Sequence, residues 1–287
     1  AGGGAINMTH VHDIIVRNNL LHHNRANSVT IYQDTGTFEQ GSKRVLVTGN
    51  TIHFAPGQGR SGINIQETSE KVVITGNIFV SGGSRGNLQV ESEHLSTIIS
   101  DYNLFWGVDQ SVLVEQPGDK LISLDQWRTL SGNDMHSRLA DPLFGDIAGF
   151  DFMPADSSPA IDAAAPLDSV RAMVASLEGT SWLLAALDSL AAGDFDGNSR
   201  PMGEAPDIGA YEFHPSLESM YDFNGDNQFS IADALALLMK GLRNPGNMTY
   251  DIDRDGQWGL ADVVTLVRIM IANSSAMVAT TGGVALE

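Results

Sequence analysis

Hydrophobic and polar residues alternate in short runs throughout the first half of the chain, and the runs recur every 26 to 31 residues. Four segments align without gaps, each with one asparagine at the same place: DIIVRNNLL, RVLVTGNTI, KVVITGNIF and TIISDYNLF. A second set follows them, SVTIYQ, GINIQE, NLQVES and SVLVEQ, and GAINMTH near the N-terminus fits the same template. Period-two alternation predicts strands, and a regular repeat without intervening helices predicts a β-solenoid with parallel stacking.

The apolar positions of these strands define the expected core. One rung cannot bury its apolar face alone, so successive rungs stack on one another. We expect these inward positions in the two strand sets: Ile14/Val16, Val45/Val47, Val72/Ile74 and Ile98/Ser100, then Val29/Ile31, Ile63/Ile65, Leu88/Val90 and Val112/Val114. The aligned asparagines should stack at one corner and hydrogen-bond from rung to rung: Asn19, Asn50, Asn77 and Asn103.

The outward positions of the second strand set are polar. Outward side chains of adjacent rungs lie about 4.8 Å apart, so their rows should form a groove suited to a polymer. The first row is Asn7, Thr30, Asn64, Gln89 and Leu113, and the second is Thr9, Tyr32, Gln66, Glu91 and Glu115. Carboxylates, amides and an aromatic ring fit sugar binding. We predict substrate contacts from His10, Tyr32, Asn64, Gln66 and Gln89.

Carboxylates in the second row suggest hydrolytic chemistry. Glycoside hydrolysis needs two carboxyl groups roughly 5 to 9 Å apart. Glu91 and Glu115 would be neighbours on adjacent rungs with Glu67 one rung back, so we predict these three as catalytic. Uronate elimination by a polysaccharide lyase needs a basic residue instead, and Arg17, Arg44, Arg60, Lys71 and Arg85 share no obvious row. Hydrolysis is favoured; a lyase and a non-catalytic glycan-binding surface protein remain the alternatives.

The region after the repeats carries three distinctive phrases: SLDQWRTLSGNDMHSRLADPLF, DFMPADSSPAIDAA and DFDGNSRPMGEAPDIGAYEF. With the repeats, they make residues 1–213 resemble the bacterial right-handed parallel β-helix, or pectate-lyase-like, superfamily. The resemblance implies a mainly β fold and a carbohydrate-related activity.

The expected boundaries within this part follow from where the repeats end. We place the rungs in residues 1–125 and a capping region in 126–214, where the apolar stretch VRAMVASLEGTSWLLAALDSLAAG is expected to form a helix packed on the solenoid. Since GAINMTH already reads as a second strand, we expect earlier rungs to be missing and the chain to be a fragment.

Two acidic loops stand near the C-terminus. DIDRDGQWGLAD puts oxygen-bearing residues at positions 1, 3, 5, 7 and 12 of a calcium loop of the EF-hand type, with Gly256 at the sharply turned position 6. The earlier copy, beginning at Asp222, also has a side-chain oxygen at position 9 and has Asn227 at position 6. We predict two bound Ca²⁺ ions with these ligands: Asp222, Asn224, Asp226, Gln228, Ser230 and Asp233; Asp251, Asp253, Asp255, Gln257 and Asp262.

Each loop is followed by a segment of helical periodicity, and no helix is expected before either loop. The apolar positions are Leu235, Leu238, Met239 and Leu242 in the first segment and Val263, Leu266, Val267 and Met270 in the second. The duplicated loop–helix unit resembles a small all-α type I dockerin over residues 217–273. The resemblance implies docking onto a cohesin-like scaffold domain through loop positions 10 and 11, Ile231-Ala232 and Leu260-Ala261. We place this domain at 215–273 and a flexible tail at 274–287.

Composition narrows the partners. Acidic residues outnumber basic ones 35 to 16, a net charge of −19, which argues against nucleic acid as a ligand. The absence of cysteine excludes disulfides and thiolate metal sites, and no apolar run reaches the ~20 residues of a membrane helix. Together, the two resemblances imply a secreted or surface-associated bacterial protein that degrades polysaccharide.

Overall fold

The computed structural model describes residues 4–34, 40–80, 83–107, 112–115, 119–189, 193–215, 217–226 and 228–281. The chain divides into two compact units, residues 1–213 and 214–287. The first unit contains the repeats and the second contains both acidic loops.

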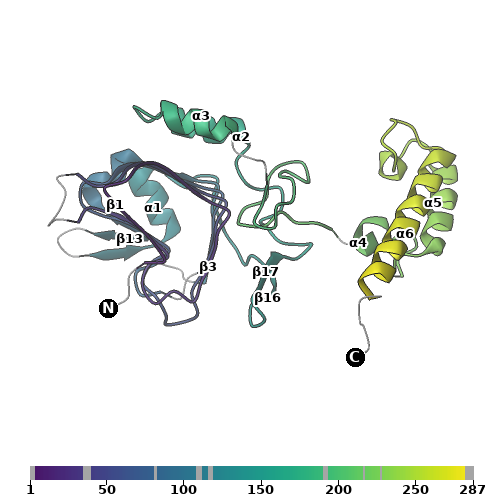
Figure 1. The fold of residues 1–287 in the computed structure, drawn as a ribbon, viewed down its shortest axis with the longest axis horizontal. Helices are drawn as coiled ribbons and strands as arrows, with labels where there is room; N and C mark the ends of the chain where they lie inside the picture. Colours follow the sequence, from purple (N-terminus) through teal and green to yellow (C-terminus); the bar gives the residue numbers. More distant parts are fainter. Residues whose placement is uncertain are drawn as a thin grey trace. The chain divides into compact units, whose positions relative to one another are not determined.

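Three sheets build the first unit, and each rung supplies one strand to each sheet (Figure 1). Sheet A contains β1 (Ile6–Thr9), β4 (Val29–Tyr32), β7 (Ile63–Ile65), β10 (Leu88–Glu91), β13 (Val112–Glu115) and β14 (Lys120–Ile122). Sheet B contains β2 (His12–Arg17), β5 (Lys43–Thr48), β8 (Glu70–Thr75) and β11 (Ile98–Asp101). Sheet C contains β3 (Leu20–His22), β6 (Thr51–His53), β9 (Ile78–Val80), β12 (Leu104–Trp106) and β15 (Arg138–Leu139).

Strand pairing in these sheets is parallel, apart from β14, which pairs antiparallel with β13. The predicted parallel β-solenoid is therefore confirmed. An antiparallel strand at the end of sheet A interrupts the rung pattern, so the stack does not continue in the same register.

The inward positions form the predicted core. The main cluster contains nearly all of them, with Ile14 packed at its border and Ser100 buried at 1% exposure. Trp127, fully buried, joins the same cluster from helix α1 (Leu124–Ser131), which follows β14. Helix α1 begins with a capping box between Ser123 and Gln126 and ends at Gly132 in the left-handed conformation.

The asparagine ladder is also confirmed. Each side-chain Nδ2 donates to the Oδ1 of the asparagine one rung on: Asn19 to Asn50 at 2.8 Å, Asn50 to Asn77 at 2.9 Å and Asn77 to Asn103 at 3.1 Å. The ladder ends on Asp134, whose Oδ1 accepts from Asn103 Nδ2 at 3.1 Å and whose Oδ2 accepts from Trp127 Nε1 at 2.8 Å. Burial raises the pKa of Asp134, and these donors oppose that rise.

The apolar stretch after the rungs forms two helices, where the sequence predicts one. Helices α2 (Leu167–Ala175) and α3 (Ser181–Ser189) lie on either side of Gly179, whose φ of +75° ends the helical path. They cover the outer face of sheet B, where Leu46 and Val73 pack against Val170 and Leu183. The packing on the solenoid is as expected. A short hairpin, β16 (Phe144–Asp146) and β17 (Asp151–Pro154), precedes these helices (Figure 1).

A buried ionic cluster organises the segment after α3. Arg200 Nε donates to Glu212 Oε2 at 2.8 Å, and Glu212 is 1% exposed. Asp207 lies beside this pair and accepts backbone N–H bonds from Asp162 and Phe213. Burial raises the pKa of Asp207 to about 6, with Glu212 adding repulsion.

This raised pKa predicts a pH-dependent stability. A carboxyl group whose pKa is higher in the folded than in the unfolded state stabilises the fold when protonated, and that contribution is lost as the pH rises towards about 6. Relative to Asp207→Asn, which cannot ionise, the wild-type protein should lose about 2 kcal/mol of unfolding free energy between roughly pH 4 and 7. Urea unfolding of both proteins across this range measures the difference; a difference that does not change with pH would contradict the assignment.

The second unit contains α4 (Leu217–Tyr221), α5 (Ile231–Arg243), the 3₁₀ turn η2 (Met248–Tyr250) and α6 (Leu260–Thr281). Its small core has four buried residues: Phe223, Ala234, Leu237 and Leu266. The expectation of no helix before either loop is wrong for the first loop, which α4 precedes; only η2 precedes the second. Among the described residues, no helix is long and apolar enough to cross a membrane.

Candidate functional sites

The two acidic loops adopt the same hydrogen-bonded conformation. In the first, the N–H of Asp226 donates to Asp222 Oδ1 at 3.1 Å and to Asn224 Oδ1 at 2.7 Å. In the second, the N–H of Asp255 donates to Asp251 Oδ1 at 3.1 Å and to Asp253 Oδ1 at 3.2 Å. In both copies, the backbone N–H of position 5 is therefore hydrogen-bonded to the side chains of positions 1 and 3. These bonds curve the backbone so that alternate side chains converge.

The aspartate at position 12 closes each loop. Asp233 and Asp262 are both 0% exposed, at the first turns of α5 and α6. Oδ1 of Asp233 accepts the N–H of Asn224 at 3.1 Å, and Oδ1 of Asp262 accepts the N–H of Asp253 at 3.2 Å. Oδ2 of each accepts the N–H of position 9, from Ser230 at 2.8 Å and from Gly259 at 2.6 Å. This aspartate links the start of the loop to the helix that follows it.

The second loop brings three carboxylates together. Asp251, Asp253 and Asp255 each place an oxygen within 4.8 Å of the others. The pKa of Asp253 is raised by desolvation and by the negative charges of Asp255, Asp262 and Asp251. None of the groups that shift the pKa of Asp253 is a positive side chain. Carboxylate oxygens that converge in this way are the ligands that a hard cation such as Ca²⁺ prefers. The residues therefore fit the predicted ion.

The remaining predicted ligands lie in the same loops. The N–H of Gln228 donates to Asp226 Oδ1 at 2.9 Å, and the N–H of Gln257 donates to Asp255 Oδ1 at 2.8 Å. In a calcium loop of this type, position 7 contributes its backbone carbonyl oxygen to the ion. Ser230 also caps α5 through its side chain. Gly256 has the positive φ, +88°, expected at position 6, whereas Asn227 lies outside the described residues.

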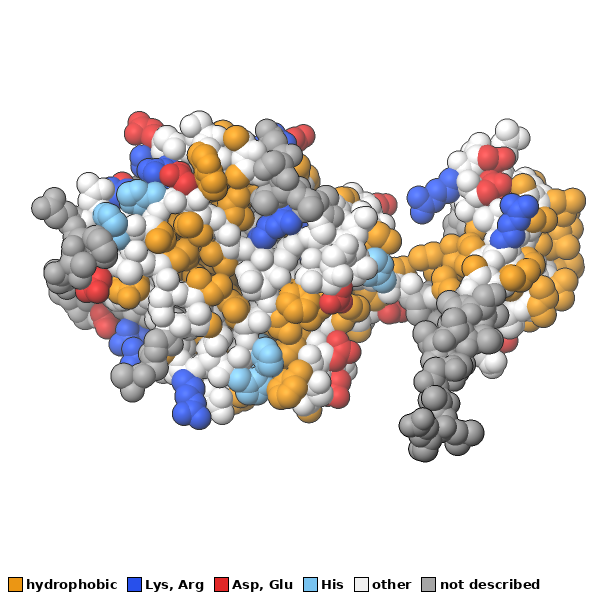
Figure 2. All heavy atoms as spheres, viewed as in Figure 1, with side chains coloured by type: hydrophobic (Ala, Val, Ile, Leu, Met, Phe, Trp, Pro, Cys, Tyr) orange, Lys and Arg blue, Asp and Glu red, His pale blue; other side chains and the backbone are white. Residues whose placement is uncertain are grey.

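Each helix after a loop exposes a row of apolar side chains. The α5 stripe comprises Ile231, Leu235, Met239 and Leu242, which are 63%, 61%, 53% and 63% exposed. The α6 stripe comprises Leu260, Val264 and Ile271, which are 70%, 49% and 62% exposed. Figure 2 shows this unit with hydrophobic side chains gathered on the surface of α5. Each residue of the α5 stripe aligns with the residue 29 positions later in the sequence. Three of these are members of the α6 stripe, and Arg268 is at the position that aligns with Met239.

These stripes include part of the predicted partner-binding set. Ile231 and Leu260 begin them, Ala261 is exposed and Ala232 is half-buried. The sequence did not separate the stripes from the core, because Leu235, Met239 and Leu242 have the periodicity of a buried face. In the structure, Ala234 and Leu237 instead pack between α5 and α6.

The predicted rows on sheet A have the expected register. Asn7, Thr30, Asn64, Gln89 and Leu113 are Cα partners from strand to strand, as are Thr9 with Tyr32 and Glu91 with Glu115. Gln66 follows directly after β7. The strand positions of the predicted groove are therefore correct, although the side chains of Leu113 and Glu115 lie outside the described set.

The expectation that the first row is open to solvent is wrong for its three central members, although Asn7 is exposed. Thr30, Asn64 and Gln89 are 8%, 3% and 0% exposed. The Ser61 hydroxyl lies 2.9 Å from Asn27 Oδ1 and 3.3 Å from Gln89 Oε1. Polar residues at the strand starts thus hydrogen-bond among themselves and cover the row, so a glycan has no direct access to Asn64 or Gln89.

The second row, at the strand ends, stays partly accessible. Tyr32 and Gln66 are half-buried, and His10 is exposed with its Nδ1 3.0 Å from Gln40 O. Gln66 Oε1 accepts from Asn64 Nδ2 at 2.8 Å. Of the predicted substrate contacts, a long ligand could therefore reach those along the C-terminal ends of the sheet A strands.

Two of the predicted catalytic glutamates, Glu67 and Glu91, bond to the backbone of neighbouring rungs. Oε2 of Glu67 accepts the N–H of Gln33 at 2.8 Å, and Oε2 of Glu91 accepts the N–H of Glu67. Glu91 Oε2 also lies 3.3 Å from Nε2 of the buried His94, in the 3₁₀ helix η1 (Ser92–Thr97). These carboxylates accept backbone N–H groups of residues that follow strands β4 and β7. The alternation pattern does not reveal this role.

No protein-family profile matches the chain, and a search of curated proteins found no significant match.

Proposed function

We propose that this chain is a secreted bacterial carbohydrate-active protein in which a calcium-binding unit tethers a β-solenoid that binds and hydrolyses a polysaccharide. The observation that carries the proposal is the shared hydrogen-bond pattern of the two acidic loops. Two copies 29 residues apart, with the same bonds from position 5 to positions 1 and 3, support a duplicated ion-binding module.

Calcium would be held by oxygen atoms of both loops and would neutralise their converging carboxylates. Asp251, Asp253 and Asp255 supply the side-chain oxygens of the second loop, and Asp222, Asn224 and Asp226 supply those of the first. Position 12 would add Asp233 and Asp262, which the backbone N–H groups already orient. The bound ion supplies the charge balance that lets each loop stay closed.

The exposed stripes support the tethering role. Apolar side chains that are 49% to 70% exposed in regular rows on two helices suggest a surface that a partner would cover. The resemblance to dockerins makes that partner a cohesin-like scaffold domain. Ile231 and Leu260, at loop position 10, would lie at the start of each contact row and Ala232 and Ala261 beside them.

The solenoid would bind its polysaccharide along the edge where sheet A ends. His10, Tyr32 and Gln66 offer aromatic and polar groups on successive rungs. The regular spacing of the strands would let successive sugar units of a polymer meet equivalent positions. Glu91 and Glu115 are Cα partners on adjacent strands, which would place a pair of carboxyl groups on neighbouring rungs for one glycosidic bond. Glu67 lies one rung back and would support the pair.

A second candidate function, glycan binding without catalysis, is favoured by one observation. Glu67 and Glu91 already accept backbone hydrogen bonds, as structural residues at strand ends do. In that case the solenoid would display a binding edge and the calcium unit would hold it at a surface. A lyase activity has no such support, although cationic residues for it exist.

Substitution at Glu91 separates these functions. If Glu91 is catalytic, Glu91→Gln should lower the release of reducing ends from a responsive polysaccharide roughly 100- to 10,000-fold. Glu178→Gln, at a side chain that is 95% exposed on another face, is the matched control and should leave the rate unchanged. A panel of neutral and uronate polysaccharides identifies the substrate.

The same panel gives the opposing outcomes. An unchanged rate in folded Glu91→Gln would reject the carboxylate assignment. Products that absorb in the ultraviolet would identify elimination, because that reaction leaves a double bond. Retention of a glycan without release of reducing ends would support the non-catalytic binding protein.

A further inference from the structure

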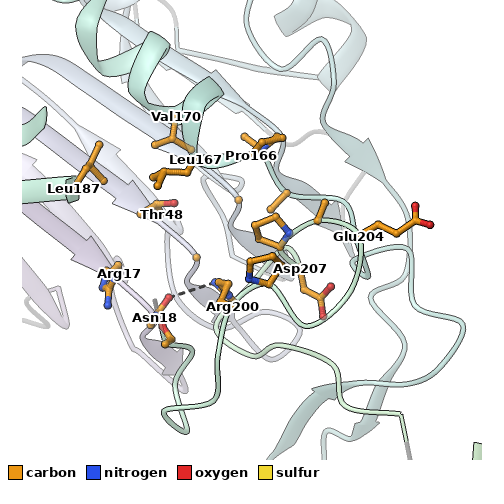
Figure 3. A pocket seen from close by; sticks show the side chains of 18 residues that line it. Arg17, Asn18, Thr48, Pro166, Leu167, Val170, Leu187, Arg200, Glu204 and Asp207 are labelled. Carbon is orange, nitrogen blue, oxygen red and sulfur yellow. Dashed lines mark hydrogen bonds between the residues drawn. The ribbon is translucent and has the colours of Figure 1, made fainter. Parts of the chain in front are cut away.

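A cavity of about 380 Å³ lies within the first unit, lined by the corner that follows sheet B, by helices α2 and α3 and by the segment 200–207 (Figure 3). The arginines and Asp207 in its lining are already engaged. Arg200 Nε donates to Glu212 Oε2 at 2.8 Å, both oxygens of Asp207 accept backbone N–H groups, and Arg17 has an interaction partner. Because these charged groups have partners within the protein, they do not indicate a ligand.

A second feature of the first unit is a cluster of two carboxylates and an imidazole at the end of β10. Glu91, Glu93 and His94 each place one potential ligand atom within 4.8 Å of those of the others. Glu91 ends the strand, and the other two lie in the 3₁₀ helix η1 that follows it. Since a 3₁₀ helix has three residues per turn, the side chains of Glu91 and His94 meet on one side of it. Nε2 of His94 accordingly lies 3.3 Å from Glu91 Oε2.

Two of these side chains are held in place by their surroundings. His94 is 7% exposed, and its backbone carbonyl accepts the hydroxyl of Thr97 at 3.0 Å. Leu95, the next residue, packs against the main core. Oε2 of Glu91 accepts the N–H of Glu67. The imidazole and the first carboxylate are therefore positioned by the fold.

Glu93 differs from the other acidic residues around this helix. Its side chain is exposed, and among the described residues it makes no hydrogen bond and no ion pair. By contrast, Glu70 on β8 is paired with Lys43 Nζ at 2.8 Å. Apart from His94, no basic side chain in the described part of the chain bonds to Glu91 or Glu93. A bound cation would therefore offset the repulsion between these two carboxylates.

The donor set of the cluster favours Zn²⁺ over Ca²⁺. Zn²⁺ binds imidazole nitrogen and carboxylate oxygen, and its catalytic sites combine three protein ligands with a water molecule. Ca²⁺ instead takes about six to eight oxygen ligands, which the acidic loops of the second unit resemble more closely. One imidazole and two carboxylates match the preference of Zn²⁺, and the exposure of Glu93 leaves a further position open to solvent.

We propose that Glu91, Glu93 and His94 bind a Zn²⁺ ion, whose open position takes water or an oxygen atom of a ligand at the end of sheet A. This site goes beyond the proposed hydrolysis and the calcium-dependent tether. Glu91 acts in it as a metal ligand. Glu93 and His94, which the proposed hydrolysis does not use, therefore distinguish the two roles.

Titration of the full chain with Zn²⁺ in excess Ca²⁺ tests the site, because Ca²⁺ then competes for the acidic loops. Loss of even an outer partner of a metal site costs about 10- to 100-fold in affinity, so Glu93→Gln should bind Zn²⁺ at least about tenfold more weakly than the wild type. Calorimetry measures the affinity, and Co²⁺ in place of Zn²⁺ should give a visible absorption band that this variant loses. Glu204→Gln, at an exposed glutamate outside the cluster, is the matched control and should bind as the wild type does.

A second variant tests the imidazole. His94→Asn should weaken Zn²⁺ binding at least as much as Glu93→Gln does, and circular dichroism checks that each variant is folded. His22→Asn is its control, because Nδ1 of His22 lies 2.8 Å from Nδ1 of His23 and this pair is another place where Zn²⁺ could bind. The control should leave the affinity of the cluster unchanged.

Two results would overturn the proposal. If folded Glu93→Gln binds Zn²⁺ as tightly as the wild type, Glu91 and His94 form an ion pair only. If His22→Asn removes the binding and Glu93→Gln does not, the ion belongs to the other histidines. Because these measurements need no glycan, they distinguish failure of the zinc site from failure of the proposed hydrolysis.

Discussion

Removal of calcium is expected to unfold residues 214–281 and leave the solenoid folded. Among the described residues, the core of the second unit has four buried residues with eight half-buried hydrophobic residues packed against them, which is a small core for two helices and two acidic loops. In the second loop, three carboxylates lie within 4.8 Å of one another, and their repulsion acts against the closed conformation once the cation is gone. Free calcium at about 1,000 times its Kd stabilises each site by about 4 kcal/mol.

Far-UV circular dichroism with and without a chelator measures this loss, because α5 and α6 unfold with the loops. Limited proteolysis should then cut within 214–281 while residues 1–213 resist. Native mass spectrometry should show two calcium ions on the untreated chain, and one after Asp251→Asn together with Asp255→Asn.

Asp196→Asn is the matched control for calcium binding. Asp194, Asp196 and Asn198 have the spacing of a loop start, but Ala205 occupies position 12 and Asp194 already accepts the N–H groups of Asp196 and Asn198. The control should keep two ions. An unchanged spectrum in chelator and no bound calcium would reject the calcium-binding unit and with it the tether.

The asparagine ladder predicts the second large effect: Asn77→Ala should destabilise the solenoid by about 3 to 5 kcal/mol. Asn77 is 0% exposed and sits in mid-ladder. Its Nδ2 donates to Val47 O, Thr75 O and Asn103 Oδ1 at 2.9, 3.1 and 3.1 Å. Its Oδ1 accepts both N–H groups of Asn50, the backbone one at 3.0 Å and the side-chain one at 2.9 Å.

Alanine at this position removes these five buried hydrogen bonds and takes away the acceptor of the Asn50 backbone N–H; an unsatisfied buried polar group alone costs about 1 to 3 kcal/mol. Urea unfolding followed by tryptophan fluorescence reports on the solenoid, since Trp127 is buried at its end. Asn7→Ala is the control: Asn7 is exposed and its side chain exchanges two hydrogen bonds with the backbone of Gly4, so its loss should cost less than about 1 kcal/mol. Equal destabilisation by the two variants would contradict the ladder's role.

The solenoid could be predicted from local sequence pattern because the same pattern recurs in every rung. Each rung presents the same alternation and the same asparagine, so the register of Asn7 with Thr30 and of Glu91 with Glu115 follows from aligning the copies. The pairing of β14 antiparallel to β13 did not follow, since Lys120–Ile122 belongs to no repeat.

The candidate sites were predictable to different degrees. The pattern of the acidic loops is local: positions 1, 3 and 5 lie within one bend of the chain, and their spacing fixes which side chains converge. The predicted polysaccharide groove is not local. Whether Gln89 faces solvent depends on Ser61 and Asn27, which lie in other rungs, and alternation alone cannot report that cover.

The cavity at Arg17 depends still more on tertiary structure. Its walls come from residues 17–18, 48–49, 76, 164–167, 170, 187, 193, 200–201 and 204–207. Neither Arg17 nor Leu187 stands out from its neighbours in the sequence, and only packing of α2 and α3 on sheet B brings them to one space.

By itself the sequence determined the repeating strands, the asparagine ladder, the two acidic loops and the helices after them, because each depends on residues at short or repeated spacing. The tertiary structure decided which polar rows are covered, which helix faces remain exposed and where a cavity forms. These properties depend on whether segments distant in the sequence pack over a side chain and keep water from it, which a local pattern cannot report.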